Sequence, residues 1–193
     1  MKDAILRKAR ESAEVKLRFI EENAAALERC VRALVERFQS GGRLLVLGNG
    51  GSACDAQHVA VEFLHPVIEK RKPLPAIALV TDVATLTAIG NDTDFSRVFV
   101  DQLELLARPR DAVLGISTSG ASANVNRALK RAREMGLLTI GFAGRDGGRM
   151  PDLCDHCFTV KTWSIHRVQE SHTLLLHLLW DQVHVAMGED DVL

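Results

Sequence analysis

Five short apolar runs follow Gly42, and stretches with helical periodicity separate them. The runs cover Leu44 to Leu47, Ala76 to Val80, Ala112 to Ile116, Leu138 to Phe142 and Phe158 to Val160. Short apolar runs that alternate with helices are typical of parallel strands covered on both faces. The sequence therefore predicts an α/β fold, a doubly wound five-stranded parallel sheet flanked by helices. The helices are expected at Ser52 to Leu64, Val83 to Ile89, Phe95 to Leu106, Ser122 to Met135 and Ile165 to Met187.

The first forty residues carry helical apolar patterns of their own. The patterns are Leu6/Ala9/Ala13/Leu17/Ile20 and Leu27/Val31/Leu34/Val35/Phe38. A break near Glu22 and Asn23 separates them, and Ser40-Gly41-Gly42 closes the second. We expect an N-terminal helical hairpin over residues 1–40, an α/β core over 43–193, and a single domain over 1–193. The apolar stripes fit either a cap on the core or packing against a partner subunit.

Composition and charge exclude several classes of protein. The 193 residues are 47% hydrophobic and 25% charged, which suits one globular core. A net charge of -1 without a dense Lys/Arg run argues against nucleic acid as a partner. No apolar run is long enough to span a membrane, and the start Met1-Lys2-Asp3-Ala4 has no apolar signal core. We therefore expect a cytosolic (cytoplasmic) protein with no membrane partner.

Four cysteines fit a compartment in which thiols stay reduced. Only Cys154-Asp-His-Cys157 has a suggestive spacing, and a second CxxC is missing from the sequence. The spacing favours two small buried residues next to a strand over a metal or redox site.

A glycine-rich loop, Gly48-Asn49-Gly50-Gly51-Ser52, follows the first strand and opens a helix. Missing β-carbons let the backbone approach a ligand, and the first amides of a helix can bind an anion. Asn49, Gly50, Gly51 and Ser52 are therefore candidate binding residues. The loop also fits a relaxed dinucleotide fingerprint with Asp82 as a ribose ligand, an alternative that stays open. A triphosphate P-loop is disfavoured because no Gly-Lys-Ser/Thr follows.

A second polar loop follows the third strand. Four hydroxyl side chains precede the next helix there: Ser117, Thr118, Ser119 and Ser122. Hydroxyl donors and helix amides can hold a monophosphate without a lysine. One hydroxyl would indicate only a Ser-capped turn. Four of them at a second strand end favour a phosphate site.

Two helices carry candidate acid, base or metal-binding groups. His58 and Glu62 share one helical face directly behind the glycine loop, which favours a metal or proton-transfer site over a surface ion pair. On the last helix, Gln169 and His177 lie roughly 12 Å apart along the axis. Sharing one ligand would stretch both side chains, so a neighbouring subunit is left open as a contributor. His172 and His184 are expected to be packing or interface residues.

Taken together, these motifs resemble a known family. They include Gly48-Asn-Gly-Gly-Ser, Asp55-Ala-Gln-His58, Pro75-Ala-Ile-Ala-Leu, Gly90-Asn91-Asp92, Gly115-Ile-Ser-Thr-Ser-Gly120, Ser122-Ala-Asn124, Asp146-Gly-Gly148 and Gln169-Glu170-x-His172. Over nearly its whole length the chain is similar to the sugar isomerase (SIS) domain family, and within it to the bacterial phosphoheptose isomerases.

The resemblance implies a homotetramer that binds a sugar-phosphate substrate and one zinc ion per subunit. The implied zinc ligands are His58, Glu62, Gln169 and His177. The implied substrate contacts are Asn49, Gly50, Gly51, Asn91, Asp92, Ser117, Thr118, Ser119, Ser122 and Gln169.

On this resemblance we expect conversion of sedoheptulose 7-phosphate to D-glycero-D-manno-heptose 7-phosphate through an enediol, which supplies ADP-heptose for lipopolysaccharide. Glu62 is the expected base at carbon, and His177 is the expected acid/base at the oxygens. A non-catalytic branch that binds the replication initiator DnaA also resembles this chain. In that branch the positions of Glu62 and His177 carry other residues, so their presence here favours the enzyme over a regulatory or sugar-phosphate-sensing protein.

Overall fold

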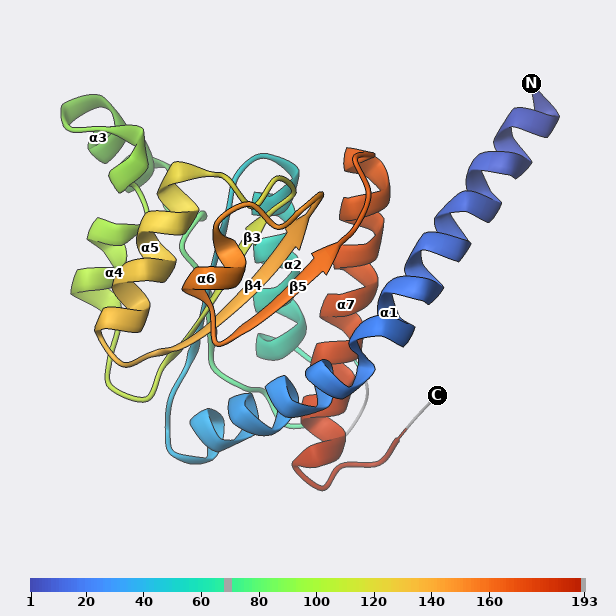
Figure 1. The fold of residues 1–193 in the computed structure, drawn as a ribbon. Coiled ribbons are helices and arrows are strands. Elements are labelled where there is room, and N and C mark those ends of the chain that lie inside the picture. The colour runs from blue at the N-terminus through green and yellow to red at the C-terminus, as the bar shows by residue number, and fades with distance from the viewer. Residues whose placement is uncertain (68–70, 192–193) are drawn as a thin grey trace.

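The core is a sheet of five parallel strands, seen in a computed structural model that describes residues 1–67 and 71–191. The strands are β1 (Leu44–Gly48), β2 (Ala76–Ala78), β3 (Ala112–Ser117), β4 (Leu138–Gly144) and β5 (His156–Val160). Their order in the sheet is β2-β1-β3-β4-β5, of which Figure 1 labels β3, β4 and β5. The predicted five-stranded parallel sheet is confirmed. β1 and β3 are neighbours although β2 separates them in sequence, so the switch point where such sheets bind ligands lies between them.

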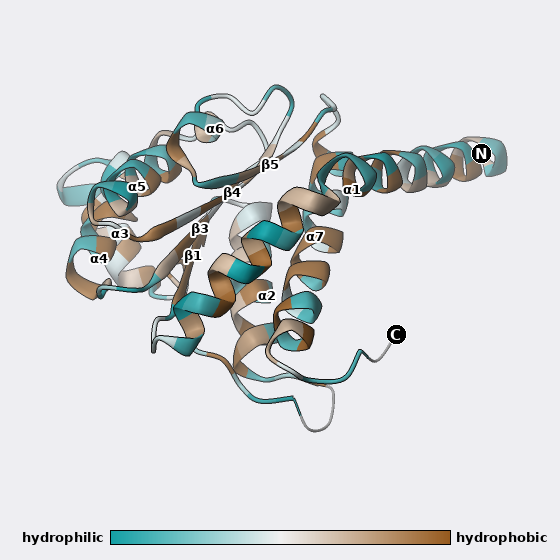
Figure 2. Ribbon diagram, turned by 60° about the horizontal axis from the view of Figure 1, so that its bottom comes forward, coloured by the Kyte–Doolittle hydropathy of each residue, from teal (hydrophilic) through white to brown (hydrophobic). Residues whose placement is uncertain are grey.

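Helices cover both faces of the sheet. They are α2 (Gly51–Leu64), α3 (Val83–Asp92), α4 (Val100–Leu106), α5 (Ala123–Glu134), α6 (Met150–Leu153) and α7 (Ile165–Ala186), with a 3₁₀ turn at Phe95–Arg97. In Figure 2, α2 and α7 lie on one side of the strands and α3 to α6 on the other. Every residue of β1, β3 and β4 is buried, which explains why these strands are continuous apolar runs.

One helix, α1 (Lys2–Gln39), replaces the predicted N-terminal hairpin, so that prediction was wrong. Figure 1 shows that α1 changes direction part-way along while remaining one helix. The Asn23 side chain donates to the Phe19 carbonyl at 2.8 Å, and such competition for a helical carbonyl bends a helix. The three alanines that follow, Ala24 to Ala26, are strong helix formers and carry the helix on.

The predicted helix over Phe95 to Leu106 is also divided in the structure. The Asp94 carboxylate accepts the Ser96 amide at 2.7 Å and caps a single 3₁₀ turn. α4 starts afresh at Val100. A strong local cap therefore outweighs the apolar periodicity on which the prediction rested.

The second half of α1 packs on the sheet and on α7, whereas residues 1–11 are exposed. A groove of about 680 Å³ remains between α1 and α7, and its walls include Leu27, Val31, Val35, Leu178 and Val185. Within the described part of the chain, none of the helices combines the length and apolarity that crossing a bilayer requires.

His172 and His184 are buried inside the chain, with 0% of each residue exposed. His172 Nε2 lies 3.0 Å from the Ala143 carbonyl of β4, which ties α7 to the sheet. His184 packs between the rings of Phe63 and Trp180. Of the two roles expected for these histidines, packing within the chain or contact at an interface, both therefore have the packing role.

Burial lowers the pKa of His172 to about 4, against the opposing hydrogen bond to Ala143. In the unfolded chain His172 binds a proton near pH 6.5, whereas in the folded chain it does so only near pH 4. The contribution of the buried neutral imidazole to folding stability is therefore complete above pH 6.5 and is lost as the pH falls toward 4. The expected loss attributable to His172 is about 3 kcal/mol. We expect His172→Gln to flatten the dependence of the unfolding free energy on pH between these values, measured by urea denaturation. A dependence as steep as that of the parent chain would contradict this assignment.

Candidate active site at the carboxyl ends of the strands

The two polar loops lie side by side at the switch point. β1 and β3 pair in register up to Gly48 and Ile116, so the loops leave the sheet next to each other. The side-chain amides of Asn49 and Asn124 donate to each other, with both distances 2.8 Å. This reciprocal pair fixes the glycine loop against the start of α5.

The hydroxyl loop turns its side chains toward one another. Ser117 Oγ lies 2.8 Å from Ser122 Oγ and 3.5 Å from Ser119 Oγ. Ser122 stands at the N-cap of α5, but its side chain makes no capping bond within the described structure. A Ser-capped turn therefore does not explain these residues. Clustered hydroxyls in front of helix amides form an arrangement that can bind an anion.

Gly120 fixes the shape of the hydroxyl loop. Its φ is 64°, and a Cβ added here would lie 1.9 Å from the Gly147 carbonyl oxygen. Its own carbonyl accepts the Arg149 amide at 3.1 Å and the Asn126 side chain at 3.0 Å. The loop is thus held from two sides by the backbone that follows β4 and by α5.

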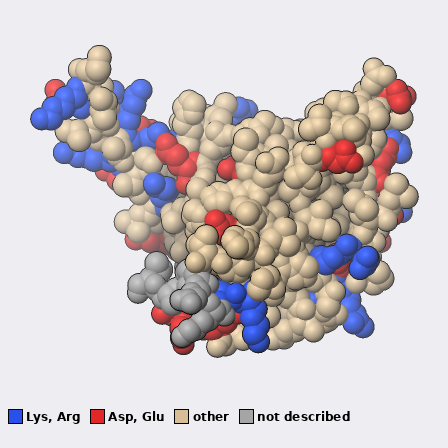
Figure 3. Space-filling view, turned by 180° about the vertical axis from the view of Figure 1, so that it is seen from behind, with Lys and Arg blue, Asp and Glu red and all other residues tan. Residues whose placement is uncertain are grey.

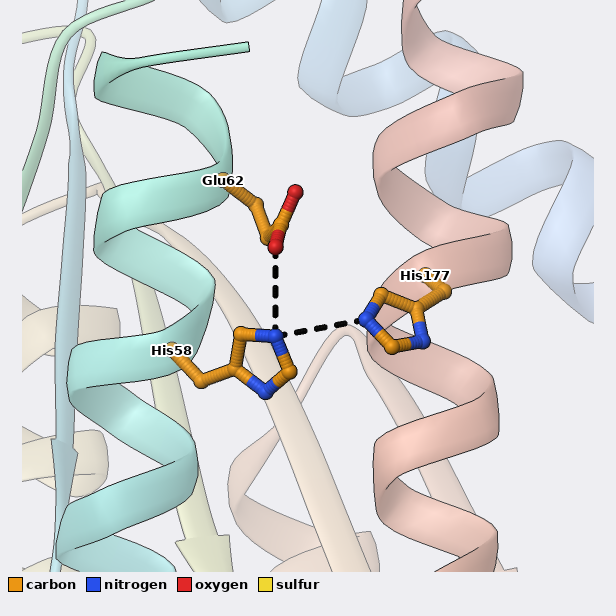
Figure 4. Close-up of side chains that lie close together, drawn as sticks. All are labelled: His58, Glu62 and His177. Carbon is orange, nitrogen blue, oxygen red and sulfur yellow. Dashed lines mark hydrogen bonds and ion pairs between the residues drawn. The ribbon is translucent and has the colours of Figure 1, made fainter. Parts of the chain in front are cut away.

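His58, Glu62 and His177 form a compact group between α2 and α7 (Figure 4). Their ligand atoms all lie within 4.8 Å of one another. His58 Nε2 is 3.2 Å from Glu62 Oε1 and 3.3 Å from His177 Nε2. Figure 4 shows the second Glu62 carboxylate oxygen turned away from His58. Two imidazoles and a carboxylate that converge in this way can bind a metal ion.

Gln169 contacts a different part of α2. A Cβ added to Gly51 would lie 2.1 Å from Gln169 Nε2, so this glycine makes room for the amide. Gln169 thus faces the start of α2, and His177 faces His58 about two turns further along both helices. α2 and α7 therefore run in the same direction, which brings three of the four expected ligands together and leaves Gln169 beside the glycine loop.

Partial burial and the neighbouring His58 lower the pKa of His177, while Glu62 acts in the opposite direction. The neutral imidazole, which is the metal-binding and proton-accepting form, is therefore favoured at His177.

Asp55 is a residue for which the sequence predicted no role. It lies one turn before His58 on α2, its pKa is raised by burial to about 6, and the nearby His58 opposes the shift. Its Oδ2 atom is buried without a hydrogen-bond partner among the described residues. In the sequence Asp55 appeared only as part of the motif Asp55-Ala-Gln-His58, and its spacing of three residues from His58 places both on one helical face.

Asn91 and Asp92 do not join this group. They are exposed at the end of α3, and the Asn91 amide donates to the Asp92 carboxylate at 2.7 Å. α3 lies at the periphery, on the other side of the sheet from α7 (Figures 1 and 2).

A doubly wound sheet with a hydroxyl-rich loop at its switch point is the architecture of a SIS domain. The family model described as "SIS domain" matches residues 9–144. The phosphoheptose isomerase of Aquifex aeolicus is 44% identical over 180 residues, 93% of this chain and 94% of the relative. That of a Roseiflexus species is 46% identical over 179 residues, 93% of this chain and 91% of the relative.

Solved structures agree with these relatives. The phosphoheptose isomerase of Neisseria gonorrhoeae superimposes with a TM-score of 0.88 at 36% identity, covering 94% of this chain and 97% of the other. That of Francisella tularensis gives a TM-score of 0.90 at 34% identity, covering 95% and 97%. The chain belongs to the phosphoheptose isomerase family of SIS domain proteins. Membership of this family replaces the alternative interpretation of the glycine loop as a dinucleotide-binding fingerprint with Asp82 as a ribose ligand.

Proposed function

We propose that this chain converts sedoheptulose 7-phosphate to D-glycero-D-manno-heptose 7-phosphate through an enediol, the first step toward ADP-heptose. The observation that carries the proposal is the convergence of His58, Glu62 and His177 on the α2 and α7 helices, with the glycine and hydroxyl loops side by side at the switch point. Family membership supplies the substrate class, and the cluster supplies the acid/base groups. A regulatory SIS protein needs an anion loop but not this group of two imidazoles and a carboxylate.

The hydroxyl loop is the proposed phosphate site. Ser117, Thr118, Ser119 and Ser122 supply hydroxyl donors in front of α5, and Asn49, Gly50, Gly51 and Ser52 border the sugar chain. His58 lies seven residues beyond Gly51 on α2, about 10 Å along the helix. Holding the phosphate at one end of the seven-carbon substrate orients the carbonyl at its other end.

Zinc is the proposed cofactor, with His58, Glu62 and His177 as its ligands. Gln169, the fourth ligand that the resemblance implies, lies beside Gly51 within one chain, about two helical turns from His177, and is not brought to this group. Two imidazole nitrogens and a carboxylate oxygen are a donor set that zinc accepts in catalytic sites. When bound there, zinc supplies Lewis-acid polarisation of the carbonyl.

Glu62 and His177 carry the proposed proton transfers. The Glu62 carboxylate removes the proton from C1 of the ketose and returns it to C2. His177, kept neutral by its lowered pKa, moves a proton between the oxygens on C1 and C2. The division suits the two groups because Glu62 has a free oxygen and His177 is the more exposed imidazole.

A homotetramer is the proposed assembly. Figure 3 shows a face with few charged side chains over its middle, where α2 and α7 lie. Val61 and Leu64 of α2 are 51% and 50% exposed, and the groove between α1 and α7 is largely apolar. Exposed apolar surface of this kind is typical of subunit interfaces. Asn91 and Asp92, remote from the metal group within one chain, are proposed to meet substrate across such an interface.

Removing the metal tests the cofactor and the reaction together. We expect the purified chain to isomerise sedoheptulose 7-phosphate and to contain zinc by elemental analysis. Dipicolinate treatment should lower kcat by about 100-fold because carbonyl polarisation is lost, and added zinc should restore it. The control is the same treatment followed by magnesium, which prefers oxygen ligands and should restore little. Full activity in protein shown to be metal-free would refute the zinc role, and no isomerisation in zinc-loaded protein would refute the reaction.

A further inference from the structure

Two thiols, those of Cys154 and Cys157, lie against the same backbone carbon of β4. A Cβ added to Gly141 would be 2.8 Å from Cys154 Sγ and 3.2 Å from Cys157 Sγ. The space that a side chain at Gly141 would fill is therefore shared by the two sulfurs. The other cysteines sit elsewhere, Cys30 buried on α1 and Cys54 exposed on α2.

The two thiols differ in acidity and in access. A hydrogen bond with Cys157, together with burial, raises the pKa of the Cys154 thiol, and only 8% of Cys154 is exposed. The same hydrogen bond lowers the pKa of Cys157, which is partly exposed on the edge strand β5. The thiolate is the nucleophile in thiol chemistry, so Cys157 is the attacking residue and Cys154 the resolving one.

We propose that Cys154 and Cys157 form a redox modification site at which hydrogen peroxide closes an intramolecular disulfide. The Cys157 thiolate attacks one peroxide oxygen; an S–O bond forms, the O–O bond breaks, and hydroxide leaves. The Cys154 thiol loses its proton to that hydroxide, and its sulfur then attacks the sulfenic sulfur, forming the S–S bond and releasing a second hydroxide, which takes up the remaining proton. Two thiols are oxidised by two electrons in total, and the peroxide is reduced to two waters.

Closing the disulfide acts on the hydroxyl loop through α6. Cys154 follows the last residue of α6, and Met150 at the other end of α6 also lies against Gly141. The residue before α6, Arg149, donates its amide to the Gly120 carbonyl of the hydroxyl loop. A disulfide brings its sulfurs to about 2.05 Å, so closing it is expected to pull Cys154, and with it the end of α6, toward Cys157. That shift disturbs the Gly120 turn, and the expected result is weaker binding of the substrate phosphate.

Peptide mass analysis of the full, metal-loaded chain tests the site directly. The chain is treated with hydrogen peroxide, quenched with catalase, alkylated and cut with trypsin after Arg149 and Lys161, which leaves both thiols in one peptide. We expect this peptide to lose two hydrogens, to resist alkylation, and to recover both thiols with dithiothreitol. KM for sedoheptulose 7-phosphate should rise several-fold on oxidation and return on reduction, with a smaller change in kcat.

Two variants distinguish oxidation of the Cys154/Cys157 pair from oxidation of other residues in the chain. Cys157→Ser should abolish both the mass change and the KM change, whereas Cys54→Ser should keep both. Alkylation of Cys154 and Cys157 after peroxide treatment would overturn the site, whatever the isomerase activity. A KM change that persists in Cys157→Ser would overturn its link to the hydroxyl loop.

Discussion

Glu62→Gln is expected to lower kcat for sedoheptulose 7-phosphate by about 1,000-fold, the scale of a lost general base. The substitution keeps the size of the side chain and removes the carboxylate that accepts the carbon-bound proton. The proposed phosphate site lies on the hydroxyl loop, away from Glu62, so substrate binding should change little, measured by calorimetric titration. Proton transfer itself is followed by NMR in deuterated water. The parent chain should incorporate deuterium at C1 or C2, and the variant should not.

The matched control for Glu62→Gln is Glu134→Gln, since Glu134 is an exposed residue of α5 that pairs with Lys130 and Arg131 on the surface. This control should retain parental kcat. Because Glu62 is also a proposed metal ligand, the zinc content of the variant has to be measured. Parental kcat in Glu62→Gln, or deuterium uptake at the parental rate, would remove Glu62 from the mechanism.

Gly120→Ala is expected to lower kcat/KM by about 100-fold through displacement of the hydroxyl loop, the proposed phosphate site. The new Cβ would lie 1.9 Å from the Gly147 carbonyl oxygen, a backbone atom that cannot turn aside. The left-handed backbone adds strain, and we expect a loss of about 3 kcal/mol in unfolding free energy. Steady-state kinetics and urea denaturation measure the two effects.

Gly136→Ala separates steric displacement from backbone strain. Gly136 also has a positive φ, 74°, but a Cβ added there meets nothing within 4 Å. It should cost about 1 kcal/mol of stability and leave kcat/KM unchanged. If Gly120→Ala has the same kcat/KM as Gly136→Ala, the added methyl group at Gly120 does not displace the hydroxyl loop, and the prediction is wrong.

Local patterns predicted much of the fold. The sheet was predictable because buried parallel strands must be continuous apolar runs, and the loops because glycines and serines cluster where strands end. The bend in α1 depends on one side-chain hydrogen bond from Asn23, which does not interrupt the helix, and the hairpin prediction failed for that reason. The division of Phe95 to Leu106 depends on the Asp94 cap.

In the candidate site, too, local spacing predicted some features and helix packing decided others. His58 and Glu62 were predictable as a pair because a helical turn brings residues four apart onto one face. That His177 meets His58 across 119 positions depends on α2 and α7 packing side by side in the same direction. The same packing places Gln169 against Gly51.

By itself the sequence determined the parallel sheet, the positions of the glycine and hydroxyl loops and the His58/Glu62 pair, since each follows from spacing within a strand, loop or helix. Only the tertiary structure decided which imidazole joins His58 and Glu62, and that Cys154 and Cys157 share the space beside Gly141. It also decided that Asp55 is partly buried, with an oxygen that has no hydrogen-bond partner among the described residues. The physical reason is that these contacts are set by how helices pack against one another and against the sheet. Periodicity along the chain specifies which face of an element is buried, but not which residue of another element it meets.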